Sequence, residues 1–140
     1  AQPEAGVYYR IRNVNSQKML ALDDKGADGA QIVQRSPGQN ERQQWSFVKV
    51  GGHYKIVNRK SGQSLNVEST EAETPIIASD NGKNLQWSLE KKGEAYVIKS
   101  RHSGLVIDVA NESAERKSPV IQYGYHEGRN QLFELEAVQD

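Results

Sequence analysis

The last third of the chain places an acid, aromatic rings and an amide close together in sequence. Asp108 interrupts the apolar run 105–109, Tyr123 and Tyr125 follow the next apolar run, and Asn130 comes shortly afterwards. A neutral polyol offers hydroxyl groups, which pair with carboxylates and amides, and C–H faces, which stack on aromatic rings. If the fold brings these groups onto adjacent loops, they can bind such a molecule.

The composition excludes several other kinds of chemistry. The 140 residues include 18 basic and 18 acidic side chains, so no nucleic acid or anionic membrane is expected as a partner. There is no cysteine, which excludes disulfides, thiolate chemistry and zinc sites built on cysteine. No apolar run reaches the roughly 18 residues of a membrane span, so membrane insertion is not expected.

The chain contains one pattern of apolar segments three times. The corresponding apolar segments are residues 9–13, 54–58 and 96–100, then 20–22, 65–67 and 107–109, then 32–34, 76–78 and 120–122. Each copy closes on an aromatic residue: Trp45, Trp87 and Phe133. Agreement at this many places predicts repeats over about 6–51, 52–93 and 94–138, within a single domain 6–140 that follows an N-terminal tail 1–5.

Within each repeat the pattern is that of short β-strands. The apolar segments alternate or run briefly, are rich in Val, Ile and Tyr, and are bounded by Gly, Asn, Ser and Pro. Four strands per repeat predict about twelve strands and little or no helix. Because one repeat cannot bury its apolar face alone, the three are expected to close around a threefold axis as an all-β β-trefoil. A propeller needs more blades than three.

The chain also resembles a known family, the ricin-type β-trefoil lectins, which include carbohydrate-binding modules attached to glycoside hydrolases. The Q-x-W endings carry the resemblance, in Gln43 to Trp45 and in Gln131 to Phe133, where Phe replaces Trp. The second repeat departs from the pattern, because Leu85 stands where the glutamine belongs. The likeness covers residues 6–138.

The resemblance implies a sugar site formed by an acid, an aromatic ring and an amide in each intact repeat. In the third repeat these are Asp108, Tyr123 and Asn130, with a second contact from Tyr125 or His126. Gln131 is expected to brace the site by bonding backbone groups or Asn130.

The other two repeats have lost these groups. The corresponding residues are Ala21, Arg35 and Arg42 in the first repeat, and Asn66, Ser79 and Asn84 in the second. We therefore expect one working site, in the third repeat. A weak second site at Asn66 and Asn84 is the alternative.

Structural roles compete with these interpretations. Asp108 could cap a turn by accepting backbone N–H groups, and Tyr123 could shield the edge of its repeat. The closing aromatics and Tyr9, Tyr54 and Tyr96 are predicted to lie in the core. The three histidines do not occupy matching positions, so neither a metal site nor a cofactor is expected, and no residue pattern indicates catalysis.

The resulting hypothesis is a non-catalytic domain that binds a galactose-type sugar or a cell-wall polysaccharide. The resemblance implies an extracellular or periplasmic location and, as further partners, a tethered catalytic domain of a secreted glycoside hydrolase or a second copy of the chain. The competing hypothesis is a trefoil that binds protein, such as a protease inhibitor or scaffold, because two of three repeats lack the sugar-binding groups.

Overall fold

The computed structural model describes residues 2–23, 28–82 and 85–139, and these form an all-β domain. The first repeat contains β1 (Tyr8–Asn13), β2 (Met19–Leu22), β3 (Ala30–Arg35) and β4 (Trp45–Val50). The second contains β5 (His53–Asn58), β6 (Leu65–Val67), β7 (Ile76–Ala78) and β8 (Trp87–Lys92). The third contains β9 (Ala95–Ser100), β10 (Val106–Val109), β11 (Val120–Tyr123) and β12 (Phe133–Ala137). Within these ranges the only helices are three single 3₁₀ turns: η1 (Glu41–Gln43), η2 (Ala110–Glu112) and η3 (Arg129–Gln131).

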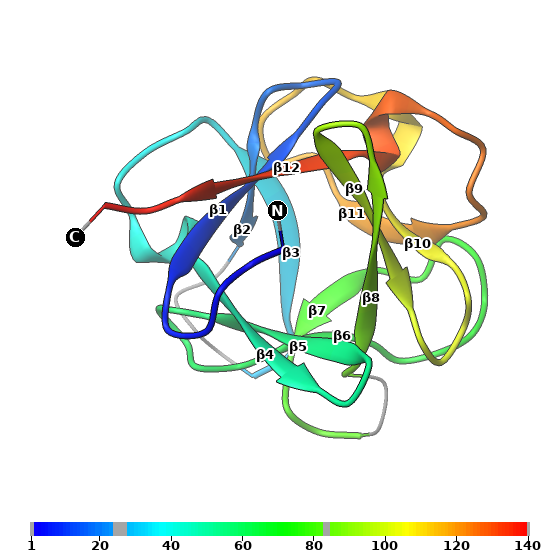
Figure 1. Cartoon of the computed structure of the whole chain (residues 1–140). Coiled ribbons are helices and arrows are strands. Elements are labelled where there is room, and N and C mark those ends of the chain that lie inside the picture. The colour runs from blue at the N-terminus through cyan, green and yellow to red at the C-terminus, as the bar shows by residue number, and fades with distance from the viewer. Residues whose placement is uncertain (1, 24–27, 83–84, 140) are drawn as a thin grey trace.

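Six of the strands close into a barrel, which confirms the predicted trefoil. The first and last strands of each repeat pair with each other, as β1 with β4, β5 with β8 and β9 with β12. Consecutive repeats are joined by the pairs β4–β5 and β8–β9, and β12 returns to pair with β1. The strands next to the two termini therefore lie side by side (Figure 1). Closure removes the open edges that a single repeat would expose.

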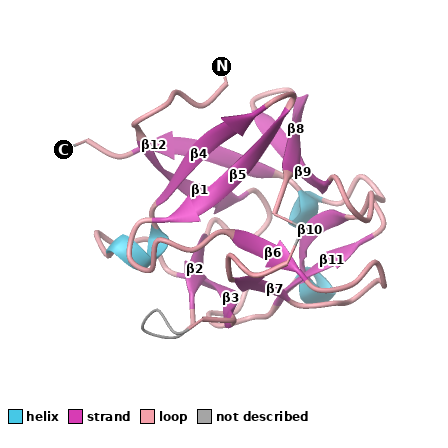
Figure 2. Ribbon diagram, turned by 90° about the horizontal axis from the view of Figure 1, so that it is seen from below, coloured by secondary structure: helices cyan, strands magenta, loops and turns pink. Residues whose placement is uncertain are grey.

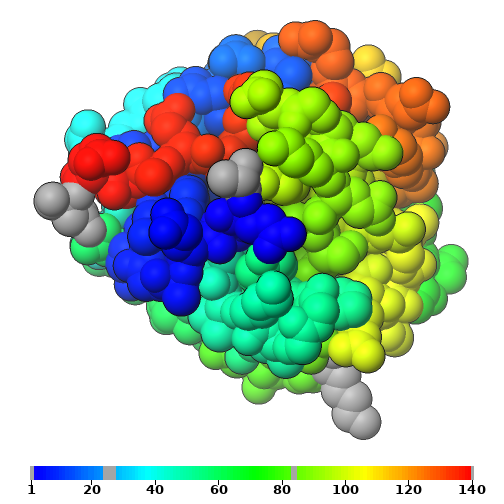
Figure 3. Space-filling view, in the orientation of Figure 1, coloured from blue at the N-terminus to red at the C-terminus, as the bar shows by residue number. Residues whose placement is uncertain are grey.

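The remaining strands form three hairpins, β2–β3, β6–β7 and β10–β11, at one end of the barrel (Figure 2). The other end is covered by the N-terminal residues, which lie at the centre of the face shown in Figure 3. There the backbone N–H of Glu4 donates to the Tyr9 hydroxyl at 2.8 Å, and the Tyr54 hydroxyl donates to Gln2 at 3.1 Å. The two ends of the barrel are thus closed by different parts of the chain.

The core lies inside the barrel and under the hairpins, as the repeat pattern predicts. Trp45, Trp87 and Phe133 are fully buried at equivalent positions. Each indole N–H donates to a backbone carbonyl, Trp45 to Leu20 at 3.0 Å and Trp87 to Leu65 at 3.1 Å. These bonds connect the last strand of a repeat to the hairpin of the same repeat. The tryptophans therefore hold the hairpins, which form a cap on this end of the barrel, against the barrel as well as filling the core.

Two buried glutamines connect neighbouring repeats. Gln122 on β11 donates its side-chain amide to the backbone carbonyls of Ser69 and Glu71 in the second repeat, at 2.9 and 2.7 Å. Gln34 on β3 makes the same pair of bonds to residues 113 and 115 of the third repeat. The loop before the third strand of one repeat is therefore held against the hairpin of the next. The loop that contains Ser69 and Glu71 in the second repeat therefore lies against the β10–β11 hairpin of the third repeat.

No helix in the described ranges is long and apolar enough to cross a membrane. The same ranges contain no group of three His, Asp or Glu side chains placed to hold a metal ion.

Candidate functional site

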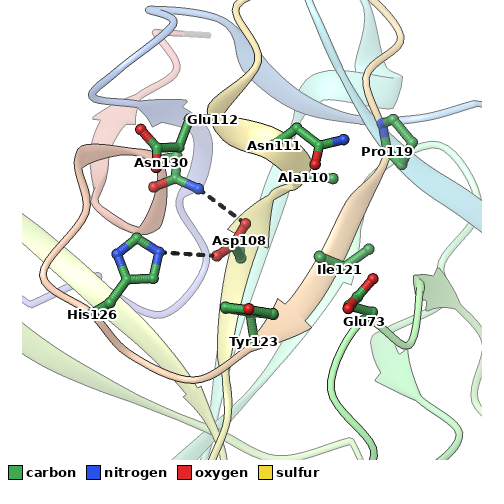
Figure 4. Close-up of a pocket in the computed structure, with 10 residues that line it drawn as sticks. All are labelled: Glu73, Asp108, Ala110, Asn111, Glu112, Pro119, Ile121, Tyr123, His126 and Asn130. Carbon is green, nitrogen blue, oxygen red and sulfur yellow. Dashed lines mark hydrogen bonds and ion pairs between the residues drawn. The ribbon is translucent and has the colours of Figure 1, made fainter.

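A pocket of about 560 Å³ opens beside the β10–β11 hairpin of the third repeat (Figure 4). Four of the side chains predicted from the sequence line it: Asp108, Tyr123, His126 and Asn130. Asp108 comes from β10, Tyr123 from the end of β11, and the other two from the segment that leads into β12. The fold thus brings together, in one concave surface, groups separated by some twenty residues of sequence.

Asp108 lies at the centre of the pocket and is held by two side-chain amides. Its Oδ1 accepts a hydrogen bond from Asn130 Nδ2 at 3.0 Å, and its Oδ2 accepts one from Gln131 Nε2 at 2.8 Å. The residue is only 3% exposed, and His126 Nε2 lies 3.8 Å from Oδ2. Its partners are side-chain amides rather than backbone N–H groups, so the turn-capping alternative does not describe this carboxylate.

The environment of Asp108 raises the pKa of its carboxyl above the usual 3.8. Burial is the main cause, because a desolvated carboxylate loses the water that stabilises its charge. The hydrogen bond from Gln131 and the nearby His126 oppose this shift, while the charge of Glu112 adds to it. Asp108 is therefore a carboxylate whose negative charge is only partly compensated by the protein, which leaves it a good acceptor for donors that enter the pocket.

We expect Asp108 to make the folded state less stable as the pH rises. Since its pKa is higher in the folded protein than in the unfolded chain, the folded state holds this proton more tightly. Its contribution to the free energy of unfolding is fully present when the pH is below 3.8, the ordinary pKa of the carboxyl in the unfolded chain. This contribution is lost as the pH rises through the pKa of the folded protein. Urea unfolding across the acid range gives the free energy of unfolding of the wild type and of Asp108→Ala at each pH. As the pH rises, the wild type should lose stability relative to the variant. A constant difference would contradict the prediction.

The amides of Asn130 and Gln131 are occupied within the protein. Asn130 Nδ2 also donates to the backbone carbonyl of Val109 at 3.0 Å, so both of its hydrogens are used. Its Oδ1 is buried and has no hydrogen-bond partner among the described residues. Gln131 Nε2 also donates to the carbonyl of Gly124 at 2.9 Å. Asn130 therefore has no free donor for a ligand, and its buried oxygen lies beside Gly128.

Gln131 braces the loop as well as the acid. Its Oε1 accepts the backbone N–H of His126 at 2.9 Å, while its Nε2 holds Gly124 and Asp108. The expected bonds to backbone groups are present, and its side-chain partner is Asp108 rather than Asn130. Gly128 completes this packing, because a Cβ there would overlap the His126 ring and lie 2.5 Å from Asn130 Oδ1.

The two tyrosines have different positions. Tyr123 is 40% exposed, lines the pocket, and meets the His126 ring edge-on with ring centres 6.1 Å apart. Tyr125 is 41% exposed but is not part of the pocket lining, and Lys92 Nζ lies 5.6 Å from its ring centre. Tyr123 is thus placed to contact a molecule in the pocket, whereas Tyr125 is placed to contact only what extends beyond it.

Sequence reasoning missed six other lining residues: Glu73, Ala110, Asn111, Glu112, Pro119 and Ile121. Asn111 and Glu112 lie in η2, which follows β10 directly, and have left-handed backbone conformations, with φ of 59° and 53°. Their closeness to Asp108 in sequence is a signal that would have found them. Glu73 belongs to the second repeat, and its position depends on how the repeats pack.

The first repeat keeps the brace and lacks the acid. Gln43 accepts the backbone N–H of Gly38 at 2.9 Å and donates to the carbonyl of Ser36 at 2.8 Å, as Gln131 does in the third repeat. The position of Asp108 is held by Ala21, which is fully buried. Arg35, at the position of Tyr123, forms an ion pair with Asp23 at 3.3 Å.

In the second repeat, the residue equivalent to Asp108 is turned inward. Asn66 is buried, and its side-chain amide donates to the backbone carbonyls of Ser79 and Asn81 at 3.1 and 2.7 Å. Its donors are therefore used within the repeat. Asn84, the other residue of the alternative second site, lies outside the described residues.

Comparisons with known proteins agree with this geometry. The sequence profile of the ricin-type β-trefoil lectin domain-like family matches residues 2–79 and 83–140. Among curated proteins, no significant match is found. A barrel of three repeats with an acid, an aromatic ring and amides at one hairpin defines a lectin-type, carbohydrate-binding domain. The chain belongs to the ricin-type β-trefoil lectin domain-like family.

Solved structures show the same likeness. A designed threefold-symmetric protein, ThreeFoil, is 38% identical with a TM-score of 0.90, over 94% of this chain and 99% of that one. An exo-β-1,3-galactanase from Clostridium thermocellum is also 38% identical with a TM-score of 0.90; the match covers 98% of this chain and 31% of the enzyme. The Macrolepiota procera ricin B-like lectin, solved with lactose, shares the fold at 21% identity and a TM-score of 0.86, over 97% and 99% of the two chains.

Proposed function

We propose that the third repeat binds a galactose-type sugar, free or at the end of a cell-wall polysaccharide. The observation that carries the proposal is Asp108, a buried carboxylate fixed by two amides at the centre of an open pocket. Two related structures support the type of sugar: a galactanase that contains a similar segment, and a lectin solved with lactose.

The pocket can bind a sugar ring on two sides. Each oxygen of Asp108 is already held by one amide and keeps a lone pair for a sugar hydroxyl, so two adjacent hydroxyls can donate to it. The Tyr123 ring supplies an apolar surface for the C–H face of the sugar. Since the carboxylate is positioned before the ligand arrives, little ordering is needed on binding. Asn130 and Gln131 therefore act mainly by positioning Asp108.

A single site of this kind binds one sugar residue weakly, on the order of millimolar or about 4 kcal/mol. Tethering to another domain, or self-association, would raise the effective affinity without new contacts. The galactanase supports tethering, because its similar segment accounts for 31% of that enzyme. We infer that this domain is a non-catalytic, secreted module that holds a partner enzyme at a polysaccharide surface.

A glycan-array screen of the wild type beside Asp108→Ala tests the proposal. We expect signal on a few related galactose-bearing glycans and loss of that signal in the variant. Signal that persists in the variant would move the site to another repeat. Absence of signal from a wild-type protein shown to be folded by circular dichroism would favour a protein partner instead.

Tyr123→Ala and Tyr125→Ala should have different effects. Removing the Tyr123 ring deletes the stacking surface and should weaken monosaccharide binding about tenfold, or about 1.4 kcal/mol, at the upper end of the roughly 0.5–1.5 kcal/mol that an aromatic pair contributes. Tyr125→Ala should leave monosaccharide binding unchanged and weaken only longer glycans, because this ring lies outside the pocket. Titrations with galactose and with a galactose trisaccharide separate the two. Equal losses for both variants on galactose would contradict the assignment.

A further inference from the structure

The pocket lining is rich in acceptors and poor in positive charge. Three carboxylates come from three segments: Asp108 on β10, Glu112 on η2, and Glu73 in the loop before β7. Neither Glu73 nor Glu112 has a hydrogen-bond or ion-pair partner for its carboxylate in the described part of the chain. Among the described lining residues, His126 alone can carry a positive charge.

The free acceptors of this lining indicate the ligand that suits it. Each oxygen of Asp108 accepts one amide hydrogen bond, and the side chains of Glu73 and Glu112 are exposed. The site therefore favours a molecule that brings hydrogen-bond donors. Hydroxyl and ammonium groups are donors, whereas a carboxylate ligand offers none and is repelled by the acids.

Glu73 is fixed in this wall by the third repeat. Its backbone N–H donates to the carbonyl of Gln122 at 2.8 Å, and the N–H of Gln122 donates to the carbonyl of Thr74 at 3.0 Å. Pro75 and Ile121, the next residues along these two segments, form an antiparallel β-bridge. Since Gln122 is the neighbour of Tyr123, these bonds hold Glu73 on the side of the pocket where Ile121 and Tyr123 lie (Figure 4).

The fold determines the backbone at this position and leaves the side chain open. Lys117 occupies the equivalent place between the third and first repeats: its φ is 66° against 69° for Glu73. Its N–H donates to the carbonyl of Gln34, the equivalent of Gln122, at 2.7 Å. Glutamate and lysine thus fill the same structural position. The charge there is not needed for folding and is available to select a ligand.

We infer that Glu73, supplied by the second repeat, makes the sugar pocket selective for neutral and amine-bearing sugars over sugars that carry a carboxylate. The inference rests on the proposed sugar site of the third repeat and adds a specificity residue from its neighbour. An exposed carboxylate at the rim changes the affinity for a charged ligand by about threefold. The three acids together should disfavour a carboxylated sugar by about tenfold or more, and less so at high salt.

The test compares galactose, galacturonic acid and galactosamine by NMR titration against the wild type and Glu73→Gln. We expect the wild type to bind galacturonic acid about tenfold more weakly than galactose at about 0.02 M salt, with a smaller ratio at about 0.5 M. Relative to galactose, Glu73→Gln should strengthen the binding of galacturonic acid about threefold and weaken the binding of galactosamine by a similar factor.

Glu4→Gln is the matched control. It removes the same charge from an exposed residue of the N-terminal segment, which lies at the end of the barrel away from the hairpins (Figure 2), and it should change none of the three affinities. Galacturonic acid binding equal to galactose in the wild type, or equal shifts from Glu73→Gln and Glu4→Gln, would overturn the inference while leaving the sugar site in place. Failure of all three sugars to bind would overturn both the inference and the proposed function.

Discussion

Replacing Asp108 with alanine is expected to weaken sugar binding by about a hundredfold, equivalent to roughly 2.7 kcal/mol. Each of its two oxygens can accept a charge-assisted hydrogen bond from a sugar hydroxyl, and no other lining carboxylate is as buried or as firmly held. The loss should exceed that caused by any other single substitution in the pocket. Titration calorimetry with galactose, or with the best glycan from the array, measures it.

The variant should remain folded, because the first repeat already has alanine at this position. Ala21 is fully buried, and Gln43 of the same repeat still braces its loop through Gly38 and Ser36. In Asp108→Ala the amides of Asn130 and Gln131 each lose one acceptor and keep another, the carbonyls of Val109 and Gly124. We expect a cost of about 1–2 kcal/mol in the free energy of unfolding, partly offset because a desolvated charge is removed.

Asn66→Ala is the matched control for binding. It changes the equivalent strand position in the second repeat, where the side chain is bonded to backbone carbonyls. It should lower stability and leave the affinity of the main site unchanged. If Asp108→Ala keeps its affinity within about threefold of the wild type, or if Asn66→Ala loses as much as Asp108→Ala, Asp108 does not carry the binding.

Trp87→Ala should have the largest effect on stability, about 4 kcal/mol of the free energy of unfolding. The side chain is fully buried at the junction of barrel and cap, and truncation leaves a cavity that the surrounding strands cannot fill. It also leaves the carbonyl of Leu65 without its donor. Since a domain of this size is stable by only about 5–15 kcal/mol, the variant should lose a large share of its stability.

Trp87→Phe separates packing from the hydrogen bond. Phe133 fills the equivalent position of the third repeat, so a phenyl ring is compatible with the fold. We expect this variant to lose about 1–2 kcal/mol, much less than Trp87→Ala. Urea unfolding measures both, with Val48→Ala as an exposed control that should stay within about 0.5 kcal/mol of the wild type. A loss below about 1 kcal/mol for Trp87→Ala would show that this position is not part of the common core.

The architecture follows from features that the sequence repeats. Three copies of a short-strand pattern, each ending in a large aromatic residue, require a shared core, and closure around a threefold axis is the arrangement that buries it. The resemblance to the ricin-type lectins, applied to the same alignment of repeats, predicts Asp108, Tyr123 and Asn130 as the site residues, because the third copy alone keeps an acid, an aromatic ring and an amide. The fold prediction depends on local patterns and their spacing, whereas the site prediction also depends on the resemblance.

Contacts between repeats could not be read in this way. Glu73 reaches the pocket only because Gln122 holds the neighbouring loop, and nothing in the sequence around Glu73 indicates that pairing. The sequence also left open which way each polar group points. In the structure, Asn130 donates both amide hydrogens, one to Asp108 and one to the carbonyl of Val109. Tyr125 lies outside the pocket.

The three repeats, the β-trefoil and the core aromatics could thus be predicted from the chain alone, as could the repeat that keeps an acid, an aromatic ring and an amide. The wall supplied by the second repeat and the acceptor character of the pocket became visible only in the folded protein. The physical reason is that strand patterns are set by the periodic burial of neighbouring residues, whereas a pocket between repeats depends on side-chain hydrogen bonds between segments far apart in the chain.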